Sequence, residues 1–100
     1  MQGVIAVQDP ARGLFAISVA AELSGTTVQN LRAYERRGLL DPERTPGGTR
    51  RYSQDDVDRL SRIRALLDAG LNLAGIEQVL DLEAEVARLE GLLEDDPRTS

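Results

Sequence analysis

The chain has 100 residues, of which 41% are hydrophobic and 29% charged, and its net charge is −5. This length is sufficient for one small domain, whose core gains stability when a further face is buried against a partner. The sequence contains no cysteine and no histidine, which excludes disulfides, thiolate metal sites, thiol redox sensing and imidazole catalysis.

Residues 1–14 are predicted to form a flexible N-terminal arm. They include no basic lead and no apolar stretch of signal-peptide length, and Asp9-Pro10 interrupts them. No apolar run in the chain approaches membrane-spanning length. We therefore expect a soluble protein of the cytoplasm, associated with the nucleoid.

Two short helices are predicted next. Ser18 can cap a first helix that stops at Gly25. The pattern Thr26-x-x-Gln29 is typical of a capping box and predicts a second helix at about 27–37, ending at Gly38. Two short helices joined through a glycine-containing turn indicate a helix-turn-helix.

The second helix has an outer face that favours DNA contact. Val28 and Leu31 share its inner face, with Glu35 beneath them. The opposite face is predicted to carry Gln29, Asn30, Ala33 and Arg37, with Tyr34 and Arg36 at its edges. Amides and guanidinium groups read adenine and guanine edges in the major groove, whereas an ordinary solvated face would carry lysine and glutamate.

A hairpin is predicted after this helix. Gly47-Gly48 between Thr45-Pro46 and Thr49-Arg50 is a turn signal, and the hairpin would make the helix-turn-helix winged. On the returning strand Arg50 and Tyr52 share one face and Arg51 lies on the other, so that one face can lie on the phosphate backbone. Tyr52 is interpreted as a core aromatic, as a phosphate contact, or as both, with its ring buried and its hydroxyl exposed.

Charge is distributed unevenly along the chain. Residues 26–52, here called the cationic segment, contain six arginines and three acids, whereas residues 68–100 contain two arginines and nine acids. A cationic helix and ribbon in an acidic chain is the electrostatic pattern expected of a DNA-binding protein.

The remaining residues predict three further helical segments. Ser53 to Asp56 can cap a third helix, whose buried stripe would be Val57, Leu60, Ile63 and Leu67 and which Gly70 would end. Asn72 can cap a short fourth helix, LAGIEQVL. Leu82, Val86, Leu89 and Leu93 then form a heptad seam, which is interpreted as the interface of an antiparallel homodimer. The alternative is that this last helix folds back on its own domain.

The stretch LRAYERRGLLDPERTPGGTRRYSQDDVDRL resembles the DNA-binding domain of the MerR family of bacterial transcription regulators. The stretches ISVAAELSG, RTPGGTRRYS and NLAGI are similar to the heat-shock repressor (HspR-type) branch of that family. The expected fold is mainly α: a winged helix-turn-helix over 15–80, a short coiled-coil dimerisation helix over 81–94 and a frayed tail over 95–100.

The resemblance also implies roles for individual residues. It places Thr27, Gln29 and Asn30 at the major groove, Arg32, Tyr34 and Arg36 on bases or phosphates, and Arg50, Arg51 and Tyr52 as the contacts of the wing. Together with Arg37 from the outer face of the helix, these are the predicted DNA-binding residues. Glu35 would be structural and pair with a nearby arginine.

The function expected from this resemblance is a homodimeric repressor of heat-shock and chaperone genes that binds an inverted repeat in double-stranded DNA, with the DnaK chaperone as a co-repressor. The alternatives are a MerR-like regulator of another set of genes, a DNA-bending protein resembling excisionases, and an adaptor that uses helix 82–94 to bind another protein. We expect no enzymatic activity, no metal and no cofactor, because no acid pairs with a nucleophile or a phosphate loop.

Overall fold

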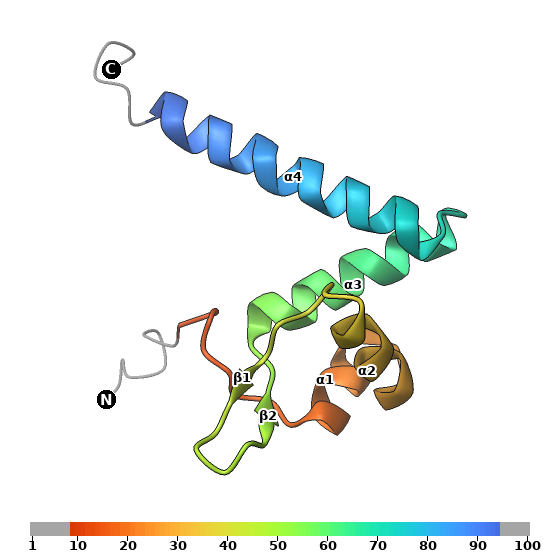
Figure 1. The fold of residues 1–100 in the computed structure, drawn as a ribbon, viewed down its shortest axis with the longest axis vertical. Coiled ribbons are helices and arrows are strands. Elements are labelled where there is room, and N and C mark those ends of the chain that lie inside the picture. The colour runs from red at the N-terminus through yellow and green to blue at the C-terminus, as the bar shows by residue number, and fades with distance from the viewer. Residues whose placement is uncertain (1–8, 95–100) are drawn as a thin grey trace. The chain divides into compact units, whose positions relative to one another are not determined.

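The computed structural model describes residues 9–94, and the chain divides into two compact units after Ala65. The first unit contains two short helices, a two-stranded sheet and most of a third helix, and the second contains the rest of that helix and a long fourth one (Figure 1). The elements are α1 (Ile17–Ser24), α2 (Val28–Arg36), β1 (Glu43–Arg44), β2 (Arg50–Arg51), α3 (Gln54–Asp68) and α4 (Leu73–Glu94). The predicted mainly helical fold with a two-stranded wing is confirmed.

Helix α1 packs against α2, as expected of a helix-turn-helix. It begins at Ile17 after Ala16, which makes no side-chain cap, so the prediction that Ser18 is the N-cap is wrong. The predicted end at Gly25 is confirmed, because Gly25 adopts a left-handed conformation with φ 72° that closes the helix. The carbonyl of Gly25 accepts a hydrogen bond from Nη1 of Arg64, which ties this turn to α3.

Helix α2 is capped by Thr27, one residue later than predicted. The hydroxyl of Thr27 accepts a hydrogen bond from the backbone N–H of Asn30 at 3.1 Å. Thr26 instead accepts the side-chain amide of Asn30 at 3.0 Å. The predicted stop at Gly38 is confirmed by its φ of 81°.

The wing is an antiparallel pair in which Glu43 faces Arg51 and Arg44 faces Arg50. Its turn is closed by a hydrogen bond from the N–H of Gly48 to the carbonyl of Thr45 at 2.8 Å. The predicted hairpin is therefore confirmed. Each strand has only two residues, and isolated hairpins of two strands are marginal in water.

Residues 9–15 brace the base of the wing. Phe15 and Tyr52 exchange backbone hydrogen bonds of 2.8 Å, and the N–H of Gly13 donates to the carboxylate of Glu43 at 2.8 Å. The carbonyl of Pro10 accepts a hydrogen bond from the N–H of Asp55 at 3.0 Å. This part of the predicted arm therefore differs from the expectation, and the rest of the arm, like the predicted tail 95–100, lies outside the described residues.

The core of the first unit is built from α1, α2, the loop after α2, the wing and α3. The loop is held to α3 by Nε of Arg59, which donates to the carbonyl of Leu39 at 2.5 Å. The buried side chains are Ala20, Ala21, Leu31, Tyr34, Leu39, Leu40, Tyr52, Val57, Leu60 and Ile63.

The start of α3 confirms the predicted cap. Ser53 Oγ accepts a hydrogen bond from the N–H of Asp56 at 3.0 Å, and the carboxylate of Asp56 accepts the N–H of Ser53 at 2.9 Å. The predicted buried stripe is correct except for Leu67, which is exposed, whereas Leu66 is buried. The predicted end at Gly70 agrees with its φ of 98°.

The second unit consists mainly of α4, which is one continuous helix of 22 residues. Asn72 accepts a hydrogen bond from the N–H of Gly75 at 2.8 Å, as expected of the predicted cap. The prediction that a short fourth helix, LAGIEQVL, is followed by a separate helix is wrong, since both segments belong to α4. No described helix is both long and apolar enough to cross a membrane.

Candidate nucleic-acid interface

Three polar side chains point away from the core of the first unit on α2. Leu31 and Tyr34 define the buried side of this helix. At about 100° per residue, the opposite side carries Gln29 and Arg36, with Arg32 beside them. All three are exposed, and none makes a hydrogen bond or ion pair with the rest of the described residues. These groups are therefore free to bind a ligand.

Tyr34 does not lie at the edge of this outer face, as the sequence predicted. The side chain is only 5% exposed and belongs to the core. Because Tyr34 follows Leu31 by three positions, the two share one side of the helix. Placing the ring inward turns the outer side toward Arg36 and Arg32 and away from Asn30.

Two predicted contact residues also serve the helix start. The hydroxyl of Thr27 is the N-cap, and the amide of Asn30 donates to Thr26. A bidentate pair with adenine uses both the oxygen and the nitrogen of an amide. In Asn30 one of the two N–H donors of the amide is already engaged, whereas in Gln29 no group of the amide is engaged within the described residues. Arg37, the C-cap of α2, is exposed and interacts within the chain.

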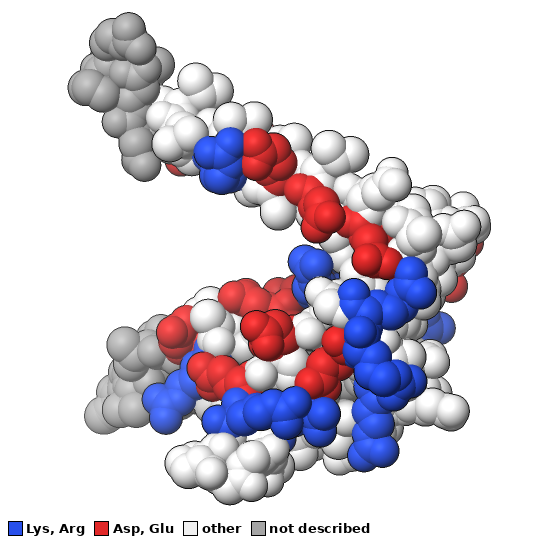
Figure 2. Space-filling model, viewed as in Figure 1, with Lys and Arg blue, Asp and Glu red and all other residues white. Residues whose placement is uncertain are grey.

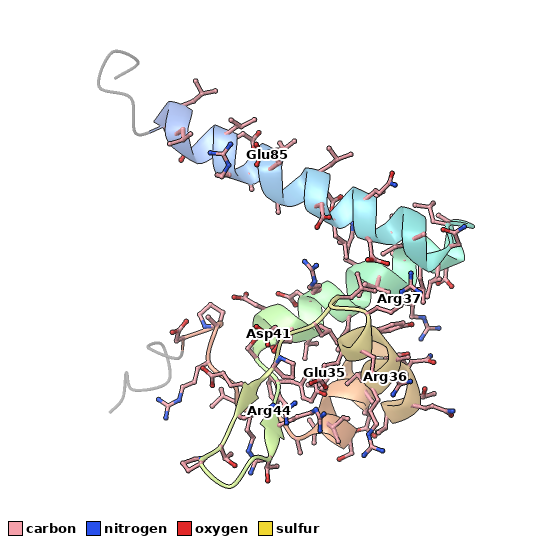
Figure 3. All side chains as sticks on the ribbon, viewed as in Figure 1. Glu35, Arg36, Arg37, Asp41, Arg44 and Glu85 are labelled. Carbon is pink, nitrogen blue, oxygen red and sulfur yellow. The ribbon has the colours of Figure 1, made fainter. Side chains whose placement is uncertain are left out.

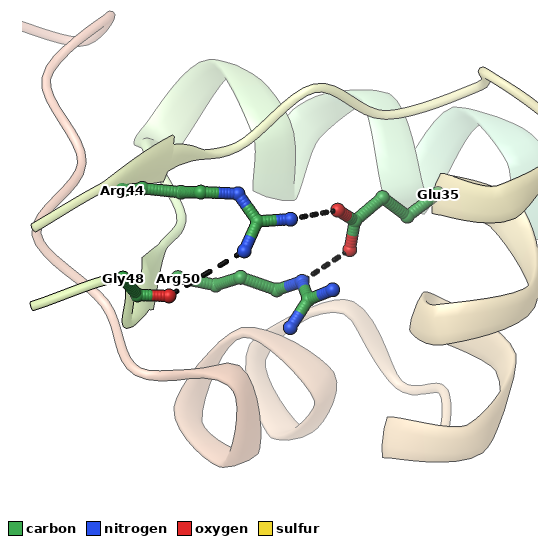
Figure 4. Close-up of polar contacts among 4 residues, drawn as sticks. All are labelled: Glu35, Arg44, Gly48 and Arg50. Carbon is green, nitrogen blue, oxygen red and sulfur yellow. Dashed lines mark hydrogen bonds and ion pairs between the residues drawn. The ribbon is translucent and has the colours of Figure 1, made fainter.

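Glu35 leaves α2 toward the wing and pairs with both of its strands (Figures 3 and 4). Nη2 of Arg44 donates to Oε2 of Glu35 at 3.0 Å, and Nε of Arg50 donates to Oε1 at 2.5 Å. The expectation that Glu35 pairs with an arginine is confirmed, and the structure adds a second one. We call these two ion pairs the Glu35 bridge.

A shallow pocket of about 250 Å³ lies at this junction and is lined by Arg32, Glu35, Arg36 and Arg50. Three guanidinium groups and one carboxylate leave the lining with a net positive charge. Arg50 contributes only Nε to the Glu35 bridge, so its terminal nitrogens are not used in it. The lining offers the planar, charged donors that suit a phosphate group.

The side chains at the end of the wing differ: Arg50 turns toward Glu35, Arg51 is partly exposed, and Tyr52, just after β2, is buried. Arg51 is partly exposed, and its side chain has no partner within residues 9–94. Tyr52 is 0% exposed, so the interpretation of this residue as a phosphate contact is wrong and the core interpretation is correct. Its buried hydroxyl has no hydrogen-bond partner among the described residues. Burial, with a smaller contribution from the negative charge of Glu35, raises the pKa of Tyr52 above its ordinary value of 10.0.

The charge pattern predicted from the sequence is visible on the surface. Basic side chains gather over α2 and the strands of the wing, and acidic side chains extend along α4 (Figure 2). In α4, Arg88 donates from Nη2 and Nε to the two oxygens of Glu85 at 2.6 and 2.9 Å, and this hydrogen bonding lowers the pKa of the Glu85 carboxyl. The surface of α4 is thus unsuited to a polyanion.

The four predicted dimer residues lie along α4 and are exposed. Leu82 is 65% exposed, and Val86, Leu89 and Leu93 are also uncovered, as is the neighbouring Leu92. Leu82 and Val86 line an apolar groove of about 310 Å³ that Glu83 and Glu90 border. A stripe of large apolar side chains exposed on one helix is typical of an interaction surface.

Sequence reasoning missed two features of this region. Arg44 was not among the predicted functional residues, although it holds one half of the Glu35 bridge. The bracing of the wing by Gly13 was not predicted either. The alternation of the strand could have placed Arg44 opposite Arg50, but no spacing in the sequence indicates that both reach Glu35.

A helix-turn-helix with its second helix polar outward, followed by a short hairpin rich in arginine, defines a winged helix-turn-helix protein. Residues 15–83 match the family model described as MerR HTH family regulatory protein. The chain therefore belongs to the MerR family.

Comparison with individual proteins gives the same assignment. The chain is 49% identical over 78 residues to a Streptomyces coelicolor relative that carries the name heat shock protein HspR, covering 77% of this chain and 52% of that protein. It is 46% identical over 67 residues to the transcriptional regulator GlnR of Bacillus anthracis, covering 67% of this chain and 52% of the relative. The chain thus spans about half the length of these curated relatives. Its fold is similar to that of the N-terminal part of MtaN, a multidrug transporter activator of Bacillus subtilis, with a TM-score of 0.64, 26% identity, and coverage of 86% of this chain and 97% of that one.

Proposed function

We propose that the chain binds double-stranded DNA, with α2 in the major groove and the wing on the adjacent backbone, and regulates transcription. The observation that carries this proposal is the outward group Gln29, Arg32 and Arg36, which has no partner within residues 9–94. Groups of this kind give bidentate contacts to base edges and phosphates. Family membership supports a regulatory rather than a catalytic role.

The predicted contact residues divide into four groups under this proposal. Gln29 and Arg36 read base edges, and Arg32 and Arg51 contact phosphates together with the terminal nitrogens of Arg50. Thr27, Asn30 and Arg37 lie at the ends of α2 and approach the backbone there. Tyr34 and Tyr52 support these groups from the core instead of contacting DNA.

The active form is a homodimer joined through α4. The seam Leu82, Val86, Leu89 and Leu93 is symmetric about a point between Ala87 and Arg88. In an antiparallel pair, Val86 would then lie opposite Leu89 of the second copy, and Leu82 opposite Leu93. A twofold dimer of this kind binds two half-sites of an inverted repeat.

The genes proposed as targets are heat-shock and chaperone genes, which the protein would repress in the cytoplasm on nucleoid DNA. The support is the 49% identity to the relative named heat shock protein HspR. The 46% identity to GlnR supports the second candidate, a regulator of another set of genes. A chaperone of the DnaK type is the co-repressor proposed with the first candidate. Adding it should tighten operator binding in the first case and have no effect in the second.

The test of DNA binding is fluorescence anisotropy with labelled duplexes at several salt concentrations. We expect the affinity to fall steeply with salt, because each neutralised phosphate releases counterions. We also expect one duplex selected from a random-sequence pool to bind at least about 10³-fold more tightly than a scrambled duplex. An affinity that does not change with salt concentration, or that is the same for the selected and the scrambled duplex, would contradict the proposal.

A further inference from the structure

Glu35 is an unusual residue to find among the proposed DNA contacts. It lines the same pocket as Arg32 and Arg36, which have no partner within the described residues. A carboxylate in this position repels phosphate, so its presence weakens the attraction that the arginines provide. Another benefit must offset this repulsion if the surface binds DNA.

The wing supplies a reason for the carboxylate. Arg44 and Arg50 face one another across the two strands, and each binds a different oxygen of Glu35 (Figure 4). Arg44 also donates to the carbonyl of Gly48 in the turn at 3.4 Å. One side chain of α2 therefore holds both strands, and through Arg44 it reaches the tip of the hairpin.

The position of the wing depends on few other contacts. Its two strands contribute two residues each, and the other contacts that hold it, the bridge between Phe15 and Tyr52 and the hydrogen bond from Gly13 to Glu43, brace its base. Glu35 is largely shielded, with its side chain 17% exposed, whereas Arg44 and Arg50 are 49% and 38% exposed. A shielded carboxylate that accepts from two guanidinium groups fixes their directions more firmly than a single surface pair would.

We propose that Glu35 is a positioning residue that couples the wing to α2, so that Arg50 joins Arg32 on a phosphate of the DNA backbone while Arg36, in the same pocket, reads a base edge. This inference rests on the proposed DNA binding. The negative charge of Glu35 weakens the attraction to any polyanion, and its two ion pairs align the wing with the groove that α2 reads. Glu35 therefore favours specific DNA over non-specific DNA.

The two effects of Glu35 can be separated because they have opposite signs. Replacing Glu35 with Gln removes the repulsion, which should leave binding to a scrambled duplex equal or tighter. The same change breaks the charge-assisted bonds to both strands, which should weaken binding to the selected duplex. We expect the ratio of specific to non-specific affinity to fall about tenfold in Glu35→Gln and further in Glu35→Ala.

The matched control is Asp41→Asn. Asp41 belongs to the same cationic segment, is exposed, and has no partner within residues 9–94 (Figure 3). The Asp41→Asn substitution removes one negative charge, as Glu35→Gln does, but leaves both ion pairs of the Glu35 bridge in place. Asp41→Asn should therefore tighten binding to the selected and the scrambled duplex alike, with the ratio unchanged.

The experiment measures both affinities for the full chain by anisotropy, below the thermal unfolding midpoint of each variant as followed by circular dichroism. If Glu35→Gln behaves like Asp41→Asn, Glu35 acts only as a charge and the inference is overturned. An equal loss on both duplexes indicates a general loss of structure and overturns it as well. A wild-type chain that shows no preference for the selected duplex contradicts the proposed function itself, and this is seen before any variant is compared.

Discussion

At the scale of single residues, the two tyrosines of the cationic segment belong to the core and the arginines around them carry the proposed contacts. Tyr52 is fully buried, and its hydroxyl finds no partner among the described residues. An unsatisfied buried hydroxyl costs stability, whereas a ring of the same shape without it does not. A substitution of Tyr52 should therefore change the stability of the core and not the recognition of DNA.

We expect Tyr52→Phe to leave the free energy of unfolding at neutral pH unchanged or to raise it by about 1 kcal/mol. The pKa of Tyr52 is raised above 10.0 in the folded protein, so the folded state retains a proton that the unfolded state releases. Stability is therefore complete below pH 10 and falls as the pH rises past it, and this loss should shrink in the variant. Urea unfolding across alkaline pH measures the difference between the two proteins. Equal alkaline losses in both would contradict the assignment, as would weaker DNA binding by the variant.

Gln29 is the residue whose replacement should alter sequence preference most cleanly. Gln29→Ala should lose about 1–3 kcal/mol of discrimination at one base pair in each half-site. The control is Gln78→Ala, which removes an exposed glutamine from α4. Binding to a set of duplexes with single base-pair changes gives the measurement. The role assigned to Gln29 fails if both variants keep the wild-type preference at every position.

At the scale of elements, the caps and turns encoded by neighbouring residues could be predicted from the sequence. Ser53 and Asp56 are three residues apart and cap each other, and Gly38 ends α2 as expected. The cap of α2 was displaced by one position because Thr26 and Thr27 are adjacent and both can accept a hydrogen bond. Local pattern alone does not choose between them.

Features that join distant residues could not be predicted in this way. Glu35 reaches Arg44 and Arg50 across 9 and 15 positions, and Gly13 reaches Glu43 across 30. The side of α2 that is buried depended on whether the Tyr34 side chain packs inward, and the residues next to Tyr34 in the sequence do not decide this. The continuity of α4 follows from the absence of glycine and proline around Asp81, although the change in hydrophobic pattern suggested a boundary.

The segment before α1 should matter for the wing. A Cβ added at Gly13 would lie 2.7 Å from the carbonyl oxygen of Arg51 and 2.9 Å from the carboxylate of Glu43. Gly13→Ala should therefore push this segment off the wing and cost about 1–3 kcal/mol. Faster hydrogen exchange at the Tyr52 amide, together with a lower thermal midpoint, would report the displacement.

Gly47→Ala is the control for this change, because its added Cβ would meet only the hydroxyl of Thr45, at 3.9 Å. This variant should keep the exchange rate of the Tyr52 amide. Indistinguishable exchange in the two variants would show that the segment does not brace the wing.

At the scale of the whole molecule, α4 determines the proposed dimer. Its apolar seam is exposed, and a chain of this size gains stability when such a surface is buried. Leu89→Glu should place a charge in the centre of the seam and shift sedimentation from dimer to monomer. Affinity for the inverted repeat should then fall at least about 10²-fold, because two linked half-sites no longer bind together.

The control is Leu23→Glu in α1, which changes a leucine that is 53% exposed, compared with 46% for Leu89. This variant should remain a dimer. If the two variants sediment alike, the dimer is not formed through the seam of α4.

The Glu35 bridge also has a consequence for how quickly the protein finds its site. Because Arg44 and Arg50 are paired with the carboxylate of Glu35, their guanidinium groups are less available to bind DNA of the wrong sequence. Weaker binding to such DNA shortens each stay there, so that the protein dissociates and hops to a new position more often. Glu35 on the recognition helix would thus raise the rate at which the protein finds its site on the chromosome. The residue that aligns the wing would then also affect association kinetics.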